Sequence, residues 1–137
     1  MRARQASLTA MGIAIARALE SEKPESERIC YDPFARILVP AGFFRVMSFF
    51  IRSGYGELRG PGVMGFLVAR DRYIDDVLNS FLDQGLRQLV VLGAGLDSRA
   101  YRFPVKGRVT TFEVDHPATQ AEKIWRVRKI LDPFPDH

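Results

Sequence analysis

The sequence predicts an α/β protein in which N-terminal helices precede the first β-α-β part of a Rossmann-like sheet. Up to residue 87, apolar residues recur at steps of three and four, which is typical of amphipathic helices. From residue 88 onward, two short strand-forming runs are separated by a glycine turn, and an acidic residue follows the second run. We therefore divide the 137-residue chain into a helical cover region, 1–87, and the start of a Rossmann-like domain, 88–137.

The first two helices are indicated by their boundary residues. Apolar side chains at helical spacing over 8–19 predict the first helix, with Ser7 or Thr9 as a candidate cap. After a polar break, the pair Asp32-Pro33 is typical of a helix start, because aspartate caps a first turn and proline fits its first position. The run Pro40-Ala41-Gly42 is expected to end this short helix.

The rest of the helical region is an aromatic segment, a loop and one long helix. Residues 43–51 contain four phenylalanines, which indicate either packing beneath further parts of the fold or a self-association surface. Glycine and proline recur over 54–62 and predict a loop. Apolar residues at three- and four-residue steps then predict a helix from about 62 to 84, with Gly85 as its stop.

The C-terminal part has the pattern of strands. The run Gln88-Leu-Val-Val-Leu92 is short, apolar and followed directly by glycines, as expected of a buried parallel strand. Residues 109–114 are rich in β-branched side chains and predict a second strand, which Asp115-His116-Pro117 ends. A helix is expected over 118–131, and Asp132-Pro133 would end it.

Composition narrows the class of protein. Hydrophobic residues make up 47% and charged residues 26% of the sequence, as in one globular domain. The 20 basic and 16 acidic residues leave a net charge of +4, which favours an acidic ligand but is too small to indicate nucleic acid. The apolar stretch 37–51 is interrupted by Pro40 and Arg45, so no membrane span is expected. With Cys30 as the single cysteine and no signal-peptide pattern, the expected location is the cytoplasm.

The glycine turn after the first strand is the candidate ligand site. Gly93 and Gly95 permit positive φ and let a ligand approach the backbone closely. Asp115 follows Gly95 by twenty positions, where Rossmann-type units place an acidic residue on ribose hydroxyls. Parallel strands bring both groups to one edge of the sheet, so we predict an adenosine-type ligand. Asp115 could instead cap the helix that follows, with His116 only a neighbour of that cap.

The choice among adenosine ligands depends on charge. A dinucleotide fingerprint has a third glycine, for which this turn offers only the small Ser98. Asp97 lies in the turn and would repel a pyrophosphate. S-adenosyl-L-methionine carries a sulfonium and an amino group but no phosphate, so it is favoured over NAD. No cluster of His, Cys and carboxylate residues has metal-ligand spacing, and no metal is expected.

Four motifs carry a more specific resemblance. They are Asp32-Pro-Phe-Ala35, Ala69-Arg-Asp-Arg-Tyr-Ile-Asp75, Gly93-Ala-Gly-Leu-Asp-Ser-Arg-Ala-Tyr-Arg102 and Glu113-Val-Asp-His-Pro117. With them the chain resembles the leucine carboxyl methyltransferase family, in its branch of S-adenosylmethionine-dependent O-methyltransferases. The resemblance implies the class I methyltransferase fold, whose mostly parallel sheet has helices on both faces and whose N-terminal helices cover part of the cofactor pocket.

The resemblance also implies cofactor contacts. Arg70 would pair with the methionine carboxylate through its guanidinium, Gly93 would approach the cofactor with its backbone, and Asp115 would bind the ribose hydroxyls. With Gly95 of the same turn, these are the four predicted cofactor-binding residues. For Arg70 the alternative is an ion pair with Asp71 or Asp75, and the neighbouring Arg72 could take its place.

The implied reaction is methyl transfer to an oxygen of a small-molecule or peptide acceptor, either a carboxylate or a hydroxyl. Tyr73, Arg99 and Tyr101 could line the site, and no catalytic base is identifiable. Members of the family continue with further strands, so a chain that stops after two would leave a sheet edge and one face open. The alternative is therefore an inactive truncated remnant, or a fragment that associates with itself or with a complementary half.

Overall fold

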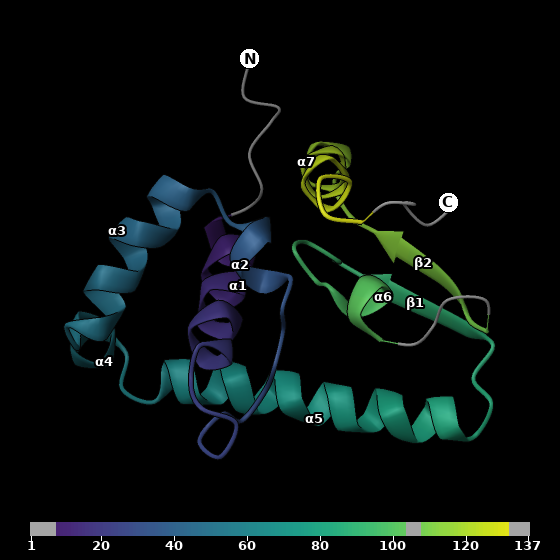
Figure 1. Ribbon diagram of the computed structural model, residues 1–137, viewed down its shortest axis with the longest axis horizontal. Coiled ribbons are helices and arrows are strands. Elements are labelled where there is room, and N and C mark those ends of the chain that lie inside the picture. Colours follow the sequence, from purple (N-terminus) through teal and green to yellow (C-terminus); the bar gives the residue numbers. More distant parts are fainter. Residues whose placement is uncertain (1–7, 104–107, 132–137) are drawn as a thin grey trace.

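The computed structural model describes residues 8–103 and 108–131 (Figure 1). Its elements are α1 (Leu8–Ser21), α2 (Ala35–Leu38), α3 (Ala41–Arg52), α4 (Tyr55–Arg59), α5 (Val63–Asp83), β1 (Gln88–Leu92), α6 (Arg99–Arg102), β2 (Thr110–Val114) and α7 (Pro117–Val127). In Figure 1 the strands lie at the right, α3 and α4 lie at the left, and α5 runs along the lower edge. Helices followed by a β-α-β unit are the fold class that the sequence predicts, and the prediction is confirmed.

The sheet consists of two parallel strands with one apolar face in solvent. In the register of the pair, Val90 lies opposite Phe112 and Leu92 lies opposite Val114. These four side chains are between 47% and 77% exposed. On the other face Glu113 accepts hydrogen bonds from Lys123 of α7 at 2.7 Å and from the Tyr101 hydroxyl of α6 at 3.2 Å. The open face expected of an isolated pair of parallel strands is therefore present.

Most predicted helix boundaries agree with the structure. Asp32 acts as the expected cap, because its Oδ1 accepts from the backbone N–H groups of Phe34 and Ala35 at 3.0 Å each. The long helix α5 ends at Asp83, and Gly85 follows with a φ of +85°. Ser7 and Asp132-Pro133, named above as boundary residues, lie outside the described residues.

Three boundaries differ from the prediction. Residues Pro40-Ala41-Gly42 do end α2, but Ala41 already begins α3, because the fixed φ of Pro40 suits the position before a first turn. The predicted loop 54–62 contains the short helix α4, since left-handed glycines before α4 and before α5 turn the chain at both sides. Helix α7 ends at Val127, short of residue 131, because the N–H groups of Lys129 and Ile130 bond to carbonyls three residues back.

One hydrophobic core joins the helices to the glycine turn. Its buried members are Met11, Ala14, Ile15, Ala18, Ala35, Leu38, Val39, Phe44, Leu96 and Val127. A second, smaller cluster contains Ala16, Cys30 and Val68. Because Leu96 and Val127 share a core with α1, α2 and α3, the packing crosses the division that we drew after residue 87. No helix within 8–103 and 108–131 is long and apolar enough to cross a membrane.

Candidate functional site

The carboxyl edge of the two strands brings the glycine turn against Asp115. The backbone N–H of Gly93 donates to the Val114 carbonyl at 2.8 Å, which ties the turn to the end of β2. Asp115 Oδ2 accepts from the Gly95 N–H at 2.6 Å, and its Oδ1 accepts from the His116 N–H at 2.6 Å. The predicted residues Gly93, Gly95 and Asp115 therefore lie together, with the carboxylate held in place by backbone donors.

The two glycines of the turn differ in what surrounds them. Gly93 is exposed with a φ of +63°, and a Cβ at this position would meet nothing within 4 Å. Gly95 is buried with a φ of +48°, and a Cβ there would lie 3.1 Å from the Cβ of Ala10 in α1. Gly93 thus offers an open backbone to a ligand, whereas Gly95 lets α1 pack closely on the turn.

Arg70 lies on α5 and has donor capacity to spare. Its Nη2 is 3.6 Å from Asp71 Oδ1, so the ion pair considered above as the alternative is present. Its Nε is buried and has no hydrogen-bond partner within the described part of the chain, while the side chain is 40% exposed. The hydrogen bonds and ion pairs of the described residues do not join Arg70 to Gly93 or Asp115.

Arg72, the alternative to Arg70, is already engaged. Its Nε lies 2.8 Å and 3.0 Å from the two carboxylate oxygens of Asp76, and its Nη1 donates to the Ile29 carbonyl at 3.1 Å. The Nε donor thus makes a bifurcated bond to Asp76 and the Nη1 donor is taken by the Ile29 carbonyl, so two nitrogens of the Arg72 guanidinium are already engaged. The geometry therefore favours Arg70 over Arg72 for holding a ligand carboxylate.

A buried network of charges, which our sequence analysis missed, fastens the turn to the helices. Arg17 of α1 has its Nε 3.0 Å from Asp32 Oδ2 and its Nη1 3.3 Å from Asp71 Oδ2. The Nη2 of Arg17 donates to the Leu96 carbonyl at 2.6 Å. These three charged side chains are at most 5% exposed. The single Arg17 side chain thus connects α1 to the loop before α2, to helix α5 and to the glycine turn.

The same network continues through α6. Arg99 Nε and Arg102 Nη2 both lie 2.7 Å from Asp75 Oδ1. Ser98 Oγ donates to Asp32 Oδ2 at 2.7 Å, which links this part to Arg17. A sequence signal existed, because Arg17 interrupts the apolar stripe of α1. Only the tertiary contacts reveal its carboxylate partners.

Two residues that we placed beside a ligand belong to this network. Arg99, a candidate for lining the site, is 5% exposed and bonds to Asp97 and Asp75. Burial by itself would raise the pKa of Asp97, but the Arg99 guanidinium and Arg17 outweigh it, so the pKa of that carboxyl is lowered. Arg99 also pairs with Asp71 and Asp75, so it is shared among three carboxylates, and the argument that Asp97 disfavours a pyrophosphate stays a prediction.

The start of α7 shows which residue caps it. The Nδ1 of His116 accepts from the Ala118 N–H at 3.2 Å, so His116 caps the helix. Asp115 instead directs its carboxylate to the backbone N–H groups of Gly95 and His116.

The two tyrosines considered for lining the site lie in different surroundings: Tyr101 is partly buried against the core, and Tyr73 is 70% exposed on α5. Among the described residues, no group of three or more metal-binding side chains is arranged to hold an ion.

The β-α-β unit, the glycine turn and the acidic residue at the end of the second strand define a Rossmann-like protein with a candidate nucleotide site. Comparison with known proteins identifies the family within this class. Residues 10–137 match the family described as leucine carboxyl methyltransferase, and the chain belongs to this family. The resemblance carried by the four sequence motifs is thereby confirmed.

Three bacterial relatives illustrate the similarity. A protein of Mycobacterium tuberculosis (strain H37Ra) is 35% identical over 119 residues, covering 80% of this chain and 37% of the relative. A protein of Mycolicibacterium paratuberculosis is 40% identical over 114 residues, with the same coverage of 80% and 37%. A protein of Mycobacterium sp. (strain JLS) is 36% identical over 144 residues, covering 94% and 45%. All three carry the name "Putative S-adenosyl-L-methionine-dependent methyltransferase". The chain thus spans less than half the length of these relatives.

Proposed function

We propose that this chain binds S-adenosyl-L-methionine at the carboxyl edge of β1 and β2. The observation that carries the proposal is the Asp115 carboxylate, which two backbone N–H groups hold beside the open backbone of Gly93. Each carboxylate oxygen retains a lone pair, so Asp115 can also accept from ribose hydroxyls. The names of the relatives support this cofactor over NAD.

Arg70 is the proposed partner of the cofactor's methionine carboxylate. Its buried Nε has no partner among the described residues, and its contact with Asp71, at 3.6 Å, is long for a hydrogen bond. Because the Arg70 side chain is 40% exposed, a carboxylate ligand can neutralise its charge at the exposed end of the guanidinium. The residues present therefore fit the cofactor at its ribose and at its carboxylate end.

The proposed reaction is methyl transfer to an oxygen of a small-molecule or peptide acceptor. S-adenosylmethionine, when bound, supplies a methyl group activated by its sulfonium, so the protein mainly has to position donor and acceptor. A carboxylate acceptor needs no general base, which agrees with the family's description as carboxyl methyltransferases. The net charge of +4 favours an acidic acceptor, and a cytoplasmic location is part of the same proposal.

Calorimetric titration of S-adenosylmethionine into the purified chain tests this proposal. We expect saturable binding that weakens at least tenfold in Arg70→Ala and in Asp115→Ala. The matched controls are Arg72→Ala and Asp76→Asn, which alter an exposed ion pair on the same helix. Circular dichroism establishes that each variant is folded. A folded wild-type chain that binds no cofactor, or an Arg72→Ala loss equal to that of Arg70→Ala, would contradict the assignment.

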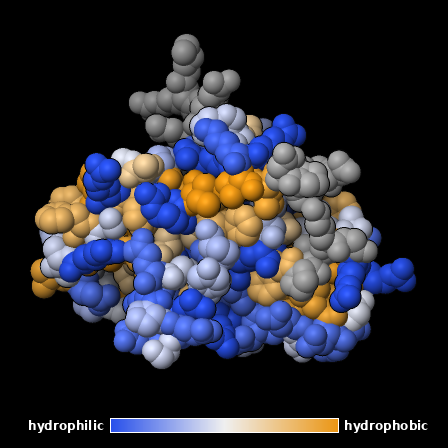
Figure 2. Space-filling view, in the orientation of Figure 1, coloured by the Kyte–Doolittle hydropathy of each residue, from blue (hydrophilic) through white to orange (hydrophobic). Residues whose placement is uncertain are grey.

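A second candidate function is self-association without catalysis. The apolar face of Val90, Leu92, Phe112 and Val114 favours it, because parallel strands are ordinarily covered on both faces. Apolar side chains also reach the surface at the left of Figure 2, where α3 and α4 lie. In these helices Phe49 and Leu58 are 69% and 82% exposed. Pairing of two copies, or of this chain with a complementary half, would cover such surfaces.

A further inference from the structure

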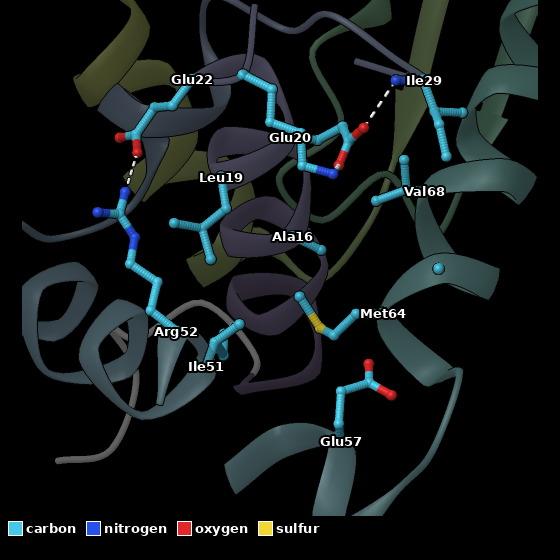
Figure 3. A pocket seen from close by; sticks show the side chains of 12 residues that line it. Ala16, Leu19, Glu20, Glu22, Ile29, Ile51, Arg52, Glu57, Met64 and Val68 are labelled. Atoms are coloured by element: carbon cyan, nitrogen blue, oxygen red, sulfur yellow. Dashed lines mark hydrogen bonds and ion pairs between the residues drawn. The ribbon is translucent and has the colours of Figure 1, made fainter. Parts of the chain in front are cut away.

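A pocket of about 500 Å³ lies between α1, the α3–α4 pair and the start of α5 (Figure 3). Its volume falls within the range of small-molecule sites. Its lining combines apolar side chains of α1, α3 and α5 with five charged residues, Glu20, Glu22, Lys23, Arg52 and Glu57. Neither the three residues proposed to hold S-adenosylmethionine nor Gly95 is among the lining residues, so the pocket requires an account of its own.

The inner part of the pocket is apolar. Figure 3 shows Leu19 from α1, Ile51 from α3 and Met64 from α5 around a common space, with Ala16 and Val68 beside them. The inner part therefore suits a hydrocarbon group, which gains free energy by leaving water.

Gly65 keeps one wall of this space free. It is the third residue of the 21-residue helix α5, and glycine in a helix is disfavoured relative to alanine by up to about 1 kcal/mol. No close helix contact requires a glycine here, because a Cβ at this position would meet nothing within 4 Å. A larger side chain at Gly65 would project into open space at the pocket, so this is a position at which a substitution can fill it.

The charges at the rim are not balanced. Lys23 Nζ lies 2.7 Å from Glu20 Oε2, and Arg52 pairs with Glu22. Glu57 accepts from the Gly62 N–H at 2.9 Å, and no ion pair of the described residues includes it. Each basic group among the lining residues is thus paired with an acid, while the exposed Glu57 carboxylate has no basic partner among those lining residues.

We propose that this pocket binds a small amphiphilic cation, with its hydrocarbon part against Leu19, Ile51 and Met64 and its ammonium group at Glu57. The apolar floor recognises the hydrocarbon, and the unbalanced carboxylate selects a cation over an anion. The site is independent of the cofactor site, so its test requires no S-adenosylmethionine.

The experiment is a titration of n-hexylammonium into the 137-residue chain, with binding detected by calorimetry or by ligand-observed NMR. Hexanoate and hexanol serve as probes of equal chain length and different charge. We expect saturable binding of hexylammonium with one site per chain, and at least tenfold weaker binding of both other probes. Glu57→Gln should weaken hexylammonium binding several-fold and leave hexanol binding unchanged.

Gly65→Leu is the variant that fills the pocket, and Gly12→Leu is its matched control. Gly12 is also a helical glycine whose Cβ would meet nothing within 4 Å, but it does not line the pocket. Binding should be lost in Gly65→Leu and retained in Gly12→Leu, with both variants folded by circular dichroism. Binding that survives Gly65→Leu, a preference for hexanoate, or no saturable binding by the folded wild-type chain would overturn the proposal.

Discussion

Arg17 illustrates how one side chain can hold three segments of this protein together. It contacts Asp32 before α2, Asp71 on α5 and the carbonyl of Leu96 in the glycine turn. Removing one member of a buried charge network leaves its partners charged, desolvated and unpaired, which costs far more than losing an exposed pair. The stability of the turn therefore depends on α1, which lies far from it in the sequence.

We expect Arg17→Met to lower the free energy of unfolding by about 3–5 kcal/mol, measured by urea denaturation. Arg52→Met is the matched control, because Arg52 is also paired with a carboxylate but its side chain is 64% exposed. Its loss should cost at most about 1 kcal/mol. Should Arg17→Met be too unstable to unfold cooperatively, Arg17→Lys provides an intermediate case. Equal effects of Arg17→Met and Arg52→Met would show that the network does not stabilise the fold.

The lowered pKa of Asp97 predicts how the free energy of unfolding changes with pH. Its pKa is lowered below the ordinary value of 3.8, so the folded state binds the proton less tightly than the unfolded chain does. The stabilisation is fully present above that ordinary value and is lost as the pH falls through the lower pKa of the folded state. Urea denaturation from pH 6 to pH 3 should show this fall. Asp97→Asn should be less stable at pH 6 and fall less steeply, whereas the exposed Asp76→Asn should parallel the wild type.

At the scale of elements, the contact of α1 with the glycine turn depends on Gly95. Alanine at Gly95 or Gly93 would adopt the left-handed conformation, at a cost of about 1–2 kcal/mol. Only at Gly95 would the new Cβ also crowd Ala10, at 3.1 Å. We expect Gly95→Ala to lower the free energy of unfolding more than Gly93→Ala does.

The double variant Ala10→Gly/Gly95→Ala is the control for this prediction. Removing the Ala10 methyl group relieves the crowding, so part of the loss caused by Gly95→Ala should be recovered relative to Ala10→Gly alone. Thermal unfolding of the wild type, the single variants Ala10→Gly and Gly95→Ala, and the double variant measures this recovery. Strictly additive effects would show that α1 does not pack on the turn through these two residues.

At the scale of the whole molecule, the exposed sheet face predicts association of the isolated chain. We expect its molar mass, measured by light scattering after size exclusion, to rise with concentration, because pairing covers the apolar face. Leu92→Lys, at a position 77% exposed on that face, should shift the chain toward the monomer. Phe66→Lys, at a position 66% exposed on α5, should have less effect. A wild-type chain that is monomeric at every concentration would contradict this prediction.

Much of this protein could be read from local patterns in its sequence. The spacing of apolar residues along α5, the Asp32 cap and the apolar run of β1 followed by Gly93 are determined within a few residues of each other. Asp115 could be placed beside the glycine turn because parallel strands meet at a common edge. Family membership was likewise visible in contiguous motifs, and residues 10–137 match the family.

Only the tertiary structure decided what the charged residues do. Asp97 and Arg99 are close in sequence, but their burial beside Arg17 and Asp75 depends on how α1 and α5 pack on the turn. The different surroundings of Gly93 and Gly95 likewise follow from Ala10, more than eighty positions away. Local patterns determine which backbone conformations form, whereas the pairing of buried charges depends on long-range contacts that no short motif contains.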